Sequence, residues 1–370
     1  MKSRREFFKK MTLGLAGSLA LQTSGTIPEQ KPVRMVKNIK PMGFQWETMD
    51  PFLFCVHHED FFPKGNKNMG PSAEYLSGRS LGDDFIVKDG FRMYHGTEVP
   101  GFPGHPHRGF ETITVVRKGI VDHADSLGAA GRYGEGDVQW MTAGKGVQHS
   151  EMFPLIKENE DNTMELFQIW LNLPAKNKMT DPHFKMMWGS QIPKYQHTDK
   201  DGKTTLAEVI AGSLHGYTAP APPPNSWAAD PTNGVAIFNI QMDAGAGFVL
   251  PAAGAGINRV LYFYEGDKLT VGDTALSSYH SAEVTADVDV MIKAGAEKAK
   301  VLILQGKPIG EQVIQYGPFV MNSKAEIQQA FEDYHRTQFG GWPWDRYDKV
   351  HDRNLSRFAR HADGRFEEGV

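Results

Sequence analysis

The segment His105-Pro-His-Arg-Gly-Phe-Glu-Thr-Ile-Thr-Val-Val116 contains the pattern that decides the fold. Its two imidazoles are two residues apart, so they share one face of the chain if the backbone is extended. The odd positions of this segment read, in order, His105, His107, Gly109, Glu111, Ile113 and Val115. A face that begins with metal-ligand residue types and ends with core residue types is expected of a strand that lines the interior of a β-barrel.

A second segment, Val147-Gln-His-Ser-Glu-Met-Phe153, repeats this alternation and would carry His149 and Glu151 on its inward face. Two such strands side by side would bring two or three imidazoles and a carboxylate to one ion. The open coordination positions of such a site suit non-haem Fe(II), Mn or a similar metal. Because burying these groups without a metal carries a large desolvation cost, the two segments together predict a metal site.

The composition limits the fold and the function further. A chain of 370 residues is long enough for two domains. Its 39 Gly and 22 Pro are dispersed, which favours short strands and turns over a helical bundle. Cys55 is the single cysteine, so intramolecular disulfides and sites with several cysteine ligands are excluded. The net charge of -4 argues against a general affinity for nucleic acid.

Residues 1–30 are predicted to be an export signal. Arg4 and Arg5, followed by Phe7, resemble a twin-arginine signal, and an apolar run follows from Met11 to Gln22. This run is shorter than the about 20 apolar residues that span a bilayer, so no stable membrane span is expected. The alternative interpretation is an amphipathic N-terminal helix. The export signal predicts a periplasmic protein in a bacterium and a passage through the twin-arginine export machinery.

The remainder divides into two strand-rich halves. In residues 33–173 the clearest strand candidates are Phe110–Val116, Gly136–Met141 and Leu166–Leu171. Residues 174–233 are rich in turns and contain the proline run Thr218–Pro224, which predicts a rigid crossover between the halves.

A second series of strands is predicted within residues 234–340, including Val235–Met242 and Gly247–Leu250. Ser323, followed three residues later by Glu326, predicts a capping box that opens a short helix over Ala325–Tyr334. Residues 341–370 are charged and aromatic without a clear period, and both an ordered wrap and a loose tail are compatible with them.

The motifs closely resemble those of the pirin family within the cupin superfamily. The resemblance extends over about residues 33–340, and it is carried by His105–Thr112, Gly136–Gly146, Val147–Met152, Leu171–Ala175 and Tyr316–Asn322. It implies an all-β fold with two cupin β-barrel (jelly-roll) domains in tandem and a short C-terminal helix. It also implies one iron in the N-terminal barrel, held by His105, His107, His149 and Glu151.

Glu111 is the alternative carboxylate. The wider cupin pattern of HxH followed by Glu would make Glu111 a ligand, whereas the pirin pattern uses Glu151. Both glutamates have the strand parity that an inward ligand needs, so periodicity does not decide between them. Following the closer family, we expect Glu151 to be the ligand and Glu111 to act in proton transfer or in orienting an imidazole.

Other polar clusters are interpreted as structural. Asp122–Asp125 is expected to be a solvated turn, and His57–Asp60 is expected to be a turn at the end of a strand. Cys55 is expected to be a buried core thiol. The second half has no HxH pair, and His280 stands alone, so the second barrel is expected to be metal-free and structural.

The resemblance implies a quercetin 2,3-dioxygenase type of activity at a mononuclear Fe(2+) site, although other divalent metals could occupy it. The expected partners are dioxygen and a small aromatic or enolic substrate, such as a flavonol or a related enol or catechol. The proton transfer by Glu111 would act on the flavonol hydroxyl. Two alternatives are a non-catalytic, metal-dependent binding or sensor protein and a cupin isomerase. Two barrels in one chain permit a monomer.

Overall fold

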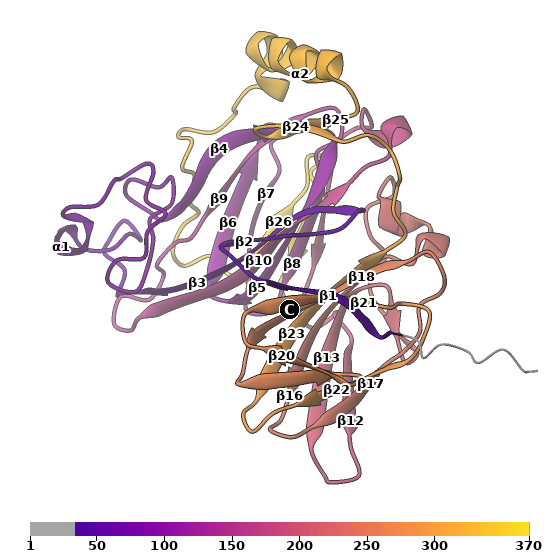
Figure 1. Ribbon diagram of the computed structural model, residues 1–370. Coiled ribbons are helices and arrows are strands. Elements are labelled where there is room, and N and C mark those ends of the chain that lie inside the picture. Colours follow the sequence, from indigo (N-terminus) through magenta and orange to yellow (C-terminus); the bar gives the residue numbers. More distant parts are fainter. Residues whose placement is uncertain (1–33, 370) are drawn as a thin grey trace, which may run out of the picture. The chain divides into compact units, whose positions relative to one another are not determined.

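Antiparallel strands dominate residues 34–369, the part of the chain that this computed structural model describes (Figure 1). The predicted export signal lies outside these residues and stays a prediction. Residues Met35–Val370 form one compact unit. Among the described residues, no helix is long and apolar enough to cross a membrane.

The first barrel consists of two six-stranded sheets. The strands of one sheet, in spatial order, are β11 (His183–Met187), β8 (Val138–Thr142), β5 (Phe110–Lys118), β10 (Asn162–Asn172), β3 (Phe52–Phe62) and β2 (Gln45–Trp46). The strands of the other are β27 (Phe366–Glu368), β26 (Phe358–Arg360), β7 (Ala130–Gly134), β6 (Ile120–Asp125), β9 (Val147–Met152) and β4 (Gly101–His107).

The second barrel combines a seven-stranded and a four-stranded sheet. The larger sheet has the order β1 (Val36–Pro41), β21 (His280–Val284), β18 (Asn258–Glu265), β23 (Ala299–Gly306), β16 (Ala236–Met242), β13 (Thr204–Ala211) and β12 (Lys194–Thr198). The smaller sheet has the order β17 (Gly247–Leu250), β22 (Val290–Ala294), β19 (Lys268–Val271) and β20 (Thr274–Ser277). Segments before residue 234 therefore contribute three strands, β1, β12 and β13, to this barrel.

Three hydrophobic clusters explain the strand sequences. One fills the second barrel and includes Phe238 and Leu261, and another fills the first barrel and includes Val116 and Tyr133. The third contains residues of both barrels, such as Ile113 of β5, and lies between them. Strand β5 is buried on both faces over Phe110–Val116, and apolar residues therefore occur on both of its faces, together with the buried polar residues Glu111, Thr112 and Thr114.

The helices are few and short. Helix α2 (Lys324–Thr337) begins at Ser323, whose hydroxyl accepts a hydrogen bond from the Glu326 N–H at 3.3 Å. It packs on the hairpin of β24 (Ile314–Tyr316) and β25 (Phe319–Met321) (Figure 1). The remaining elements are α1 (Ala73–Leu76), β14 (Ser213–Leu214), β15 (Tyr217–Thr218), and the 3-10 helices η1 (Ala175–Asn177), η2 (Trp227–Ala229), η3 (Pro231–Asn233) and η4 (Gln338–Gly340). The predicted all-β architecture with two cupin barrels and a short C-terminal helix is confirmed.

The C-terminal segment is an ordered wrap around the first barrel. Strand β26 extends its sheet by pairing with β7, so that Phe358 lies opposite Arg132. The indole N–H of Trp344 donates to the carbonyl of Asp125 at 2.8 Å, and the main-chain N–H of His351 donates to Asp122 at 2.7 Å. The sequence was compatible with an ordered wrap or a loose tail, and the structure shows the ordered wrap.

Candidate metal centre

Three imidazoles converge inside the first barrel. His105 and His107 lie on β4, and His149 lies on the neighbouring β9, directly opposite His105 in the ladder. One ring nitrogen from each side chain lies within 4.8 Å of those of the other two. The predicted HxH pair and the predicted second strand are therefore brought together by antiparallel pairing.

The ring nitrogens of these histidines are prepared for a metal. Nδ1 of His105 lies 2.9 Å from the carbonyl oxygen of Pro103, which can only accept, so Nδ1 carries the proton and Nε2 is free to bind. Nδ1 of His107 and both ring nitrogens of His149 are buried without a hydrogen-bond partner among the described residues. Such orphaned nitrogens are costly unless a ligand satisfies them, and a divalent metal would do so.

Burial keeps all three imidazoles neutral. It lowers the pKa of His105 to about 4, and it holds the pKa values of His107 and His149 well below the usual range. The mutual proximity of the rings adds to the lowering for His107 and His149. Neutral imidazole is the form that binds metals, so no proton has to be displaced near neutral pH.

Glu151 is adjacent to the cluster and is held in place by hydrogen bonds. It shares the inward face of β9 with His149, and its Oε2 lies 3.8 Å from Nε2 of that histidine. The Thr114 hydroxyl donates to Oε1 at 2.7 Å, and the Gln168 amide donates to Oε2 at 2.8 Å. Burial raises the pKa of Glu151, and these hydrogen bonds act against the increase.

Glu111 is not brought to the cluster. Its fully buried carboxylate accepts hydrogen bonds from Thr142 at 2.6 Å and from Ser226 of the crossover at 2.5 Å. Its same-face neighbour Ile113 packs in the cluster between the barrels, whereas Thr114 of the opposite face reaches Glu151. This arrangement does not support a role for Glu111 in proton transfer at the three histidines.

The reason is a break in the strand that the sequence interpretation treated as continuous. Strand β4 ends at His107 and β5 begins at Phe110, in the opposite sheet. Gly109 between them has φ +87°, and a Cβ there would lie 1.9 Å from the carbonyl oxygen of Val320. Only glycine fits this corner. Because of the corner, the odd-numbered residues of β5 face away from the interior of the first barrel, whereas His105 and His107 on β4 face into it.

Two clusters interpreted as turns lie within strands. Asp122–Asp125 belongs to β6, which is paired on both sides by β7 and β9, so the predicted solvated turn is wrong. His57–Asp60 lies in the middle of β3 rather than at its end. Cys55 is buried, as expected.

His123 is the residue of this barrel that sequence reasoning missed. It lies opposite Glu151 in the β6–β9 ladder, and its ring centroid is 5.5 Å from that of His149. Its Nε2 is 3.4 Å from Oδ2 of Asp125. The alternation His123-x-Asp125, with apolar Val121 two residues earlier, was the available signal of an inward strand face.

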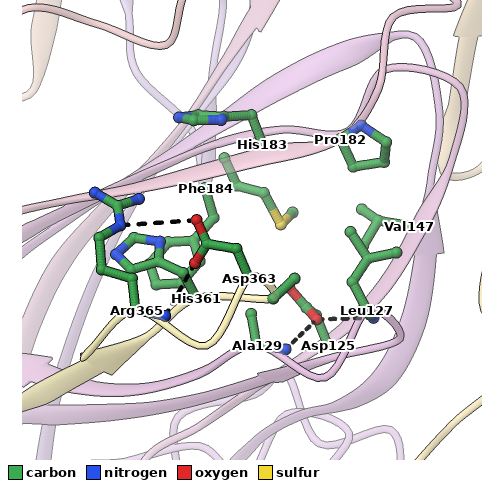
Figure 2. A pocket seen from close by; sticks show the side chains of 12 residues that line it. Asp125, Leu127, Ala129, Val147, Pro182, His183, Phe184, His361, Asp363 and Arg365 are labelled. Atoms are coloured by element: carbon green, nitrogen blue, oxygen red, sulfur yellow. Dashed lines mark hydrogen bonds and ion pairs between the residues drawn. The ribbon is translucent and has the colours of Figure 1, made fainter. Parts of the chain in front are cut away.

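The C-terminal segment lines one side of an open pocket of about 170 Å³ on the same barrel (Figure 2). Asp125 and Val147 of the barrel line it, and His361, Asp363 and Arg365 of the turn between β26 and β27 form a wall. Asp125, which lines the pocket, lies directly opposite His149 in the β6–β9 ladder. The pocket and the three histidines therefore involve neighbouring strands of the same sheet.

Comparisons with known proteins agree with this architecture. The family model described as Pirin matches residues 66–171, and the Pirin C-terminal cupin domain matches residues 237–340. A pirin-like protein of Caulobacter vibrioides is 37% identical over 258 residues, which cover 70% of this chain and 87% of that protein. Pirin of Homo sapiens is 33% identical over 263 residues, which cover 70% of this chain and 83% of that protein.

Among solved structures, a quercetin 2,3-dioxygenase from Acinetobacter baumannii superimposes with a TM-score of 0.63 at 27% sequence identity. The match covers 83% of this chain and 98% of that chain. Both family models end before residue 341, so the C-terminal wrap lies outside the part of the chain that they match.

Proposed function

The chain belongs to the pirin family, and on this premise we propose that it is a metal-dependent dioxygenase of the quercetin 2,3-dioxygenase type. The substrate would be a flavonol or a related enol or catechol. The observation that carries the proposal is the group of three converging imidazoles beside the carboxylate of Glu151, in which His107 and His149 are buried and have ring nitrogens without a hydrogen-bond partner among the described residues. The similarity to the Acinetobacter dioxygenase supports the reaction type.

We propose that His105, His107, His149 and Glu151 hold one Fe(II). Three neutral imidazoles and one carboxylate are a ligand set that iron accepts, and other divalent metals could bind the same atoms. Iron held there would supply the redox and Lewis-acid chemistry that activates dioxygen and an enolic substrate.

The protein's own residues would orient these ligands and control access to them. The Pro103 carbonyl fixes the tautomer of His105, and Thr114 with Gln168 fixes the carboxylate of Glu151. The rings of Phe110 and Trp170 pack against His107, with centroids at 5.1 and 5.4 Å, and shield this side of the cluster from water.

Oxygen uptake with quercetin tests the proposal. The protein would be loaded anaerobically with Fe(II), and wild type would be compared with His105→Ala and with Thr112→Val, a control on the same barrel. Ring opening by a dioxygenase would consume oxygen and release carbon monoxide in wild type and in Thr112→Val, but not in His105→Ala.

Other outcomes would overturn the proposal in distinguishable ways. One bound iron without oxygen uptake would discard quercetin and favour a metal-dependent binding or sensor protein. Conversion of an enolic substrate without oxygen consumption would instead indicate a cupin isomerase.

We also propose that the protein is exported to the periplasm by the twin-arginine machinery, on the basis of Arg4 and Arg5. This route carries folded proteins, so iron could be acquired in the cytoplasm, where supply rather than affinity selects the metal. Cell fractionation of wild type and of an Arg4→Lys, Arg5→Lys variant tests the location. Wild type in the cytoplasm would overturn export, and copper or zinc in the periplasmic protein would overturn the metal argument.

A further inference from the structure

Arg259 is a buried cation that forms no ion pair with the described residues. It lies on β18 of the second barrel and is only 2% exposed. Its Nε donates to the side-chain oxygen of Gln305 at 2.8 Å, and its Nη2 donates to the carbonyl of Pro251 at 2.8 Å. Nη1 has no hydrogen-bond partner in the described part of the chain, where none of the ion pairs includes this arginine.

This arrangement differs from that of the buried arginine in the first barrel. Arg132 is 1% exposed and donates to both carboxylate oxygens of Asp122, at 2.7 and 2.8 Å. The carboxylate of Asp289 acts electrostatically on Arg259, but Asp289 is exposed and its Oδ1 accepts from the main-chain N–H of Ala252. A buried guanidinium is costly without an anion, and no described residue provides one in direct contact with Arg259.

Arg259 and its two acceptors line a cavity of about 530 Å³. Part of the wall is the inner face of the barrel, because Phe238 of β16 belongs to the cluster that fills this barrel. The proline-rich crossover, including Ala219 and Pro222, also lines the cavity. The mouth of a small β-barrel is a common position for a ligand pocket.

The chemistry of the lining indicates the class of ligand. Alanine, proline, valine and phenylalanine side chains dominate, and neither Asp nor Glu lines the cavity within residues 34–369. The hydroxyls of Ser213 and Thr218, also in the lining, hydrogen-bond each other at 2.8 Å. A half-open cavity whose lining combines apolar side chains, main-chain polar groups and one guanidinium suits an organic anion better than a small, strongly hydrated inorganic one.

We propose that the mouth of the second barrel binds a small organic carboxylate with an apolar body, and that Arg259 is its anchor. The carboxylate would accept from Nη1, and the apolar body would contact Phe238 and the crossover. This site is separate from the metal centre and does not depend on the proposed dioxygenase activity.

Calorimetric titration of the full-length, metal-loaded protein with benzoate tests the proposal. Benzyl alcohol provides the neutral counterpart of the same shape, and inorganic phosphate provides an anion without an apolar body. Benzoate should bind wild type in the millimolar range or better. Removal of its charge should weaken binding at least about tenfold, as expected for a hydrogen bond to a charged group.

Variants then locate the site. Arg259→Met should weaken benzoate binding at least about tenfold, whereas Arg336→Met, which removes an exposed charge from α2, should not. Ala221→Trp changes an exposed residue of the crossover wall and should block entry without disturbing the barrel core, which circular dichroism would check.

Three results would overturn the proposal. No charge-dependent binding of benzoate to wild type would remove the site. Equal binding by wild type, Arg259→Met and Ala221→Trp would place benzoate elsewhere, for example at the three histidines. Phosphate binding as tight as benzoate binding would reject the organic carboxylate in favour of a general anion site. None of these results would affect the proposed dioxygenase, which is measured by oxygen uptake.

Discussion

The main-chain N–H of Gly104 donates a hydrogen bond to the carbonyl oxygen of Tyr347 at 2.8 Å. Gly104 immediately precedes His105, so the C-terminal wrap is attached to the edge strand that carries two of the three clustered imidazoles. A Cβ at position 104 would lie 2.5 Å from Cδ1 of the tyrosine ring, which explains why the residue is glycine. The wrap and the metal centre are therefore mechanically connected.

We expect Gly104→Ala to weaken metal binding and to lower the free energy of unfolding by about 1 kcal/mol, the lower end of the usual cost of overpacking, because the half-exposed Tyr347 ring can move. The added methyl group would push the Tyr347 ring away from β4 and shift His105. Metal titration and urea denaturation would measure the two effects. In a Tyr347→Ala background the same glycine substitution should cost much less, since the obstructing ring is gone. Equal costs in both backgrounds would contradict the mechanical connection.

Arg132→Met should destabilise the protein by about 3–5 kcal/mol, because it leaves the buried Asp122 carboxylate uncompensated. The substitution also removes the hydrogen bonds that Arg132 donates to the carbonyls of His351, Asp352 and Leu355 in the wrap. Chemical denaturation measures the loss. Adding Asp122→Leu should recover part of this loss. If the free-energy loss of the double variant equalled the sum of the losses of the two single variants, the ion pair would not be the cause.

Thr114→Val should weaken metal affinity by about 10–100-fold, the usual effect of losing a residue that orients a ligand. The hydroxyl that holds Glu151 would be replaced by a methyl group of the same size. Thr112 is a matched control, because it lies on the same face of β5 and its buried Oγ1 has no partner in the described part of the chain. Metal titration of both variants measures the difference. Similar weakening in Thr112→Val would show that packing, not the hydrogen bond, is responsible.

Local sequence patterns correctly predicted elements that depend only on neighbouring residues, such as strands with alternating side chains and the capped helix. Gly247–Leu250 is a strand with the predicted bounds, and Ser323 caps the predicted helix. His149 and Glu151 share a face of β9 because nothing interrupts that strand. The resemblance to a known family supplied the barrel architecture, which periodicity alone does not specify.

The errors came from features that depend on distant parts of the chain. The corner at Gly109 is required by the close approach of Val320, which is more than 200 residues away, and no local pattern indicates it. The polar residues of β6 are buried because the wrap provides partners for Asp122 from His351 and Arg132 provides its counter-charge. A polar strand is easily mistaken for a turn when the groups that satisfy it are not adjacent in sequence.

Glu111, displaced from the metal centre by that corner, gives a pH-dependent prediction. Burial raises its pKa from 4.5 to about 7, and the hydrogen bonds from Ser226 and Thr142 act against the increase. A folded-state pKa above that of the unfolded chain favours folding at low pH, and this contribution is lost as the pH rises from 4.5 through about 7. The loss for wild type should approach about 3 kcal/mol.

Glu111→Gln cannot ionise and should escape this loss. Urea denaturation at pH 5 and pH 8 should therefore show that the stability of the variant relative to wild type increases by about 2.5 kcal/mol between the two conditions. Glu332→Gln, at an exposed position of α2, is the control for removing one negative charge. A difference between Glu111→Gln and wild type that is the same at both pH values would mean that Glu111 ionises as readily in the folded protein as in the unfolded chain. That result would contradict the conclusion that the Glu111 carboxyl group, which Ser226 of the crossover contacts, is shielded from water in the folded protein.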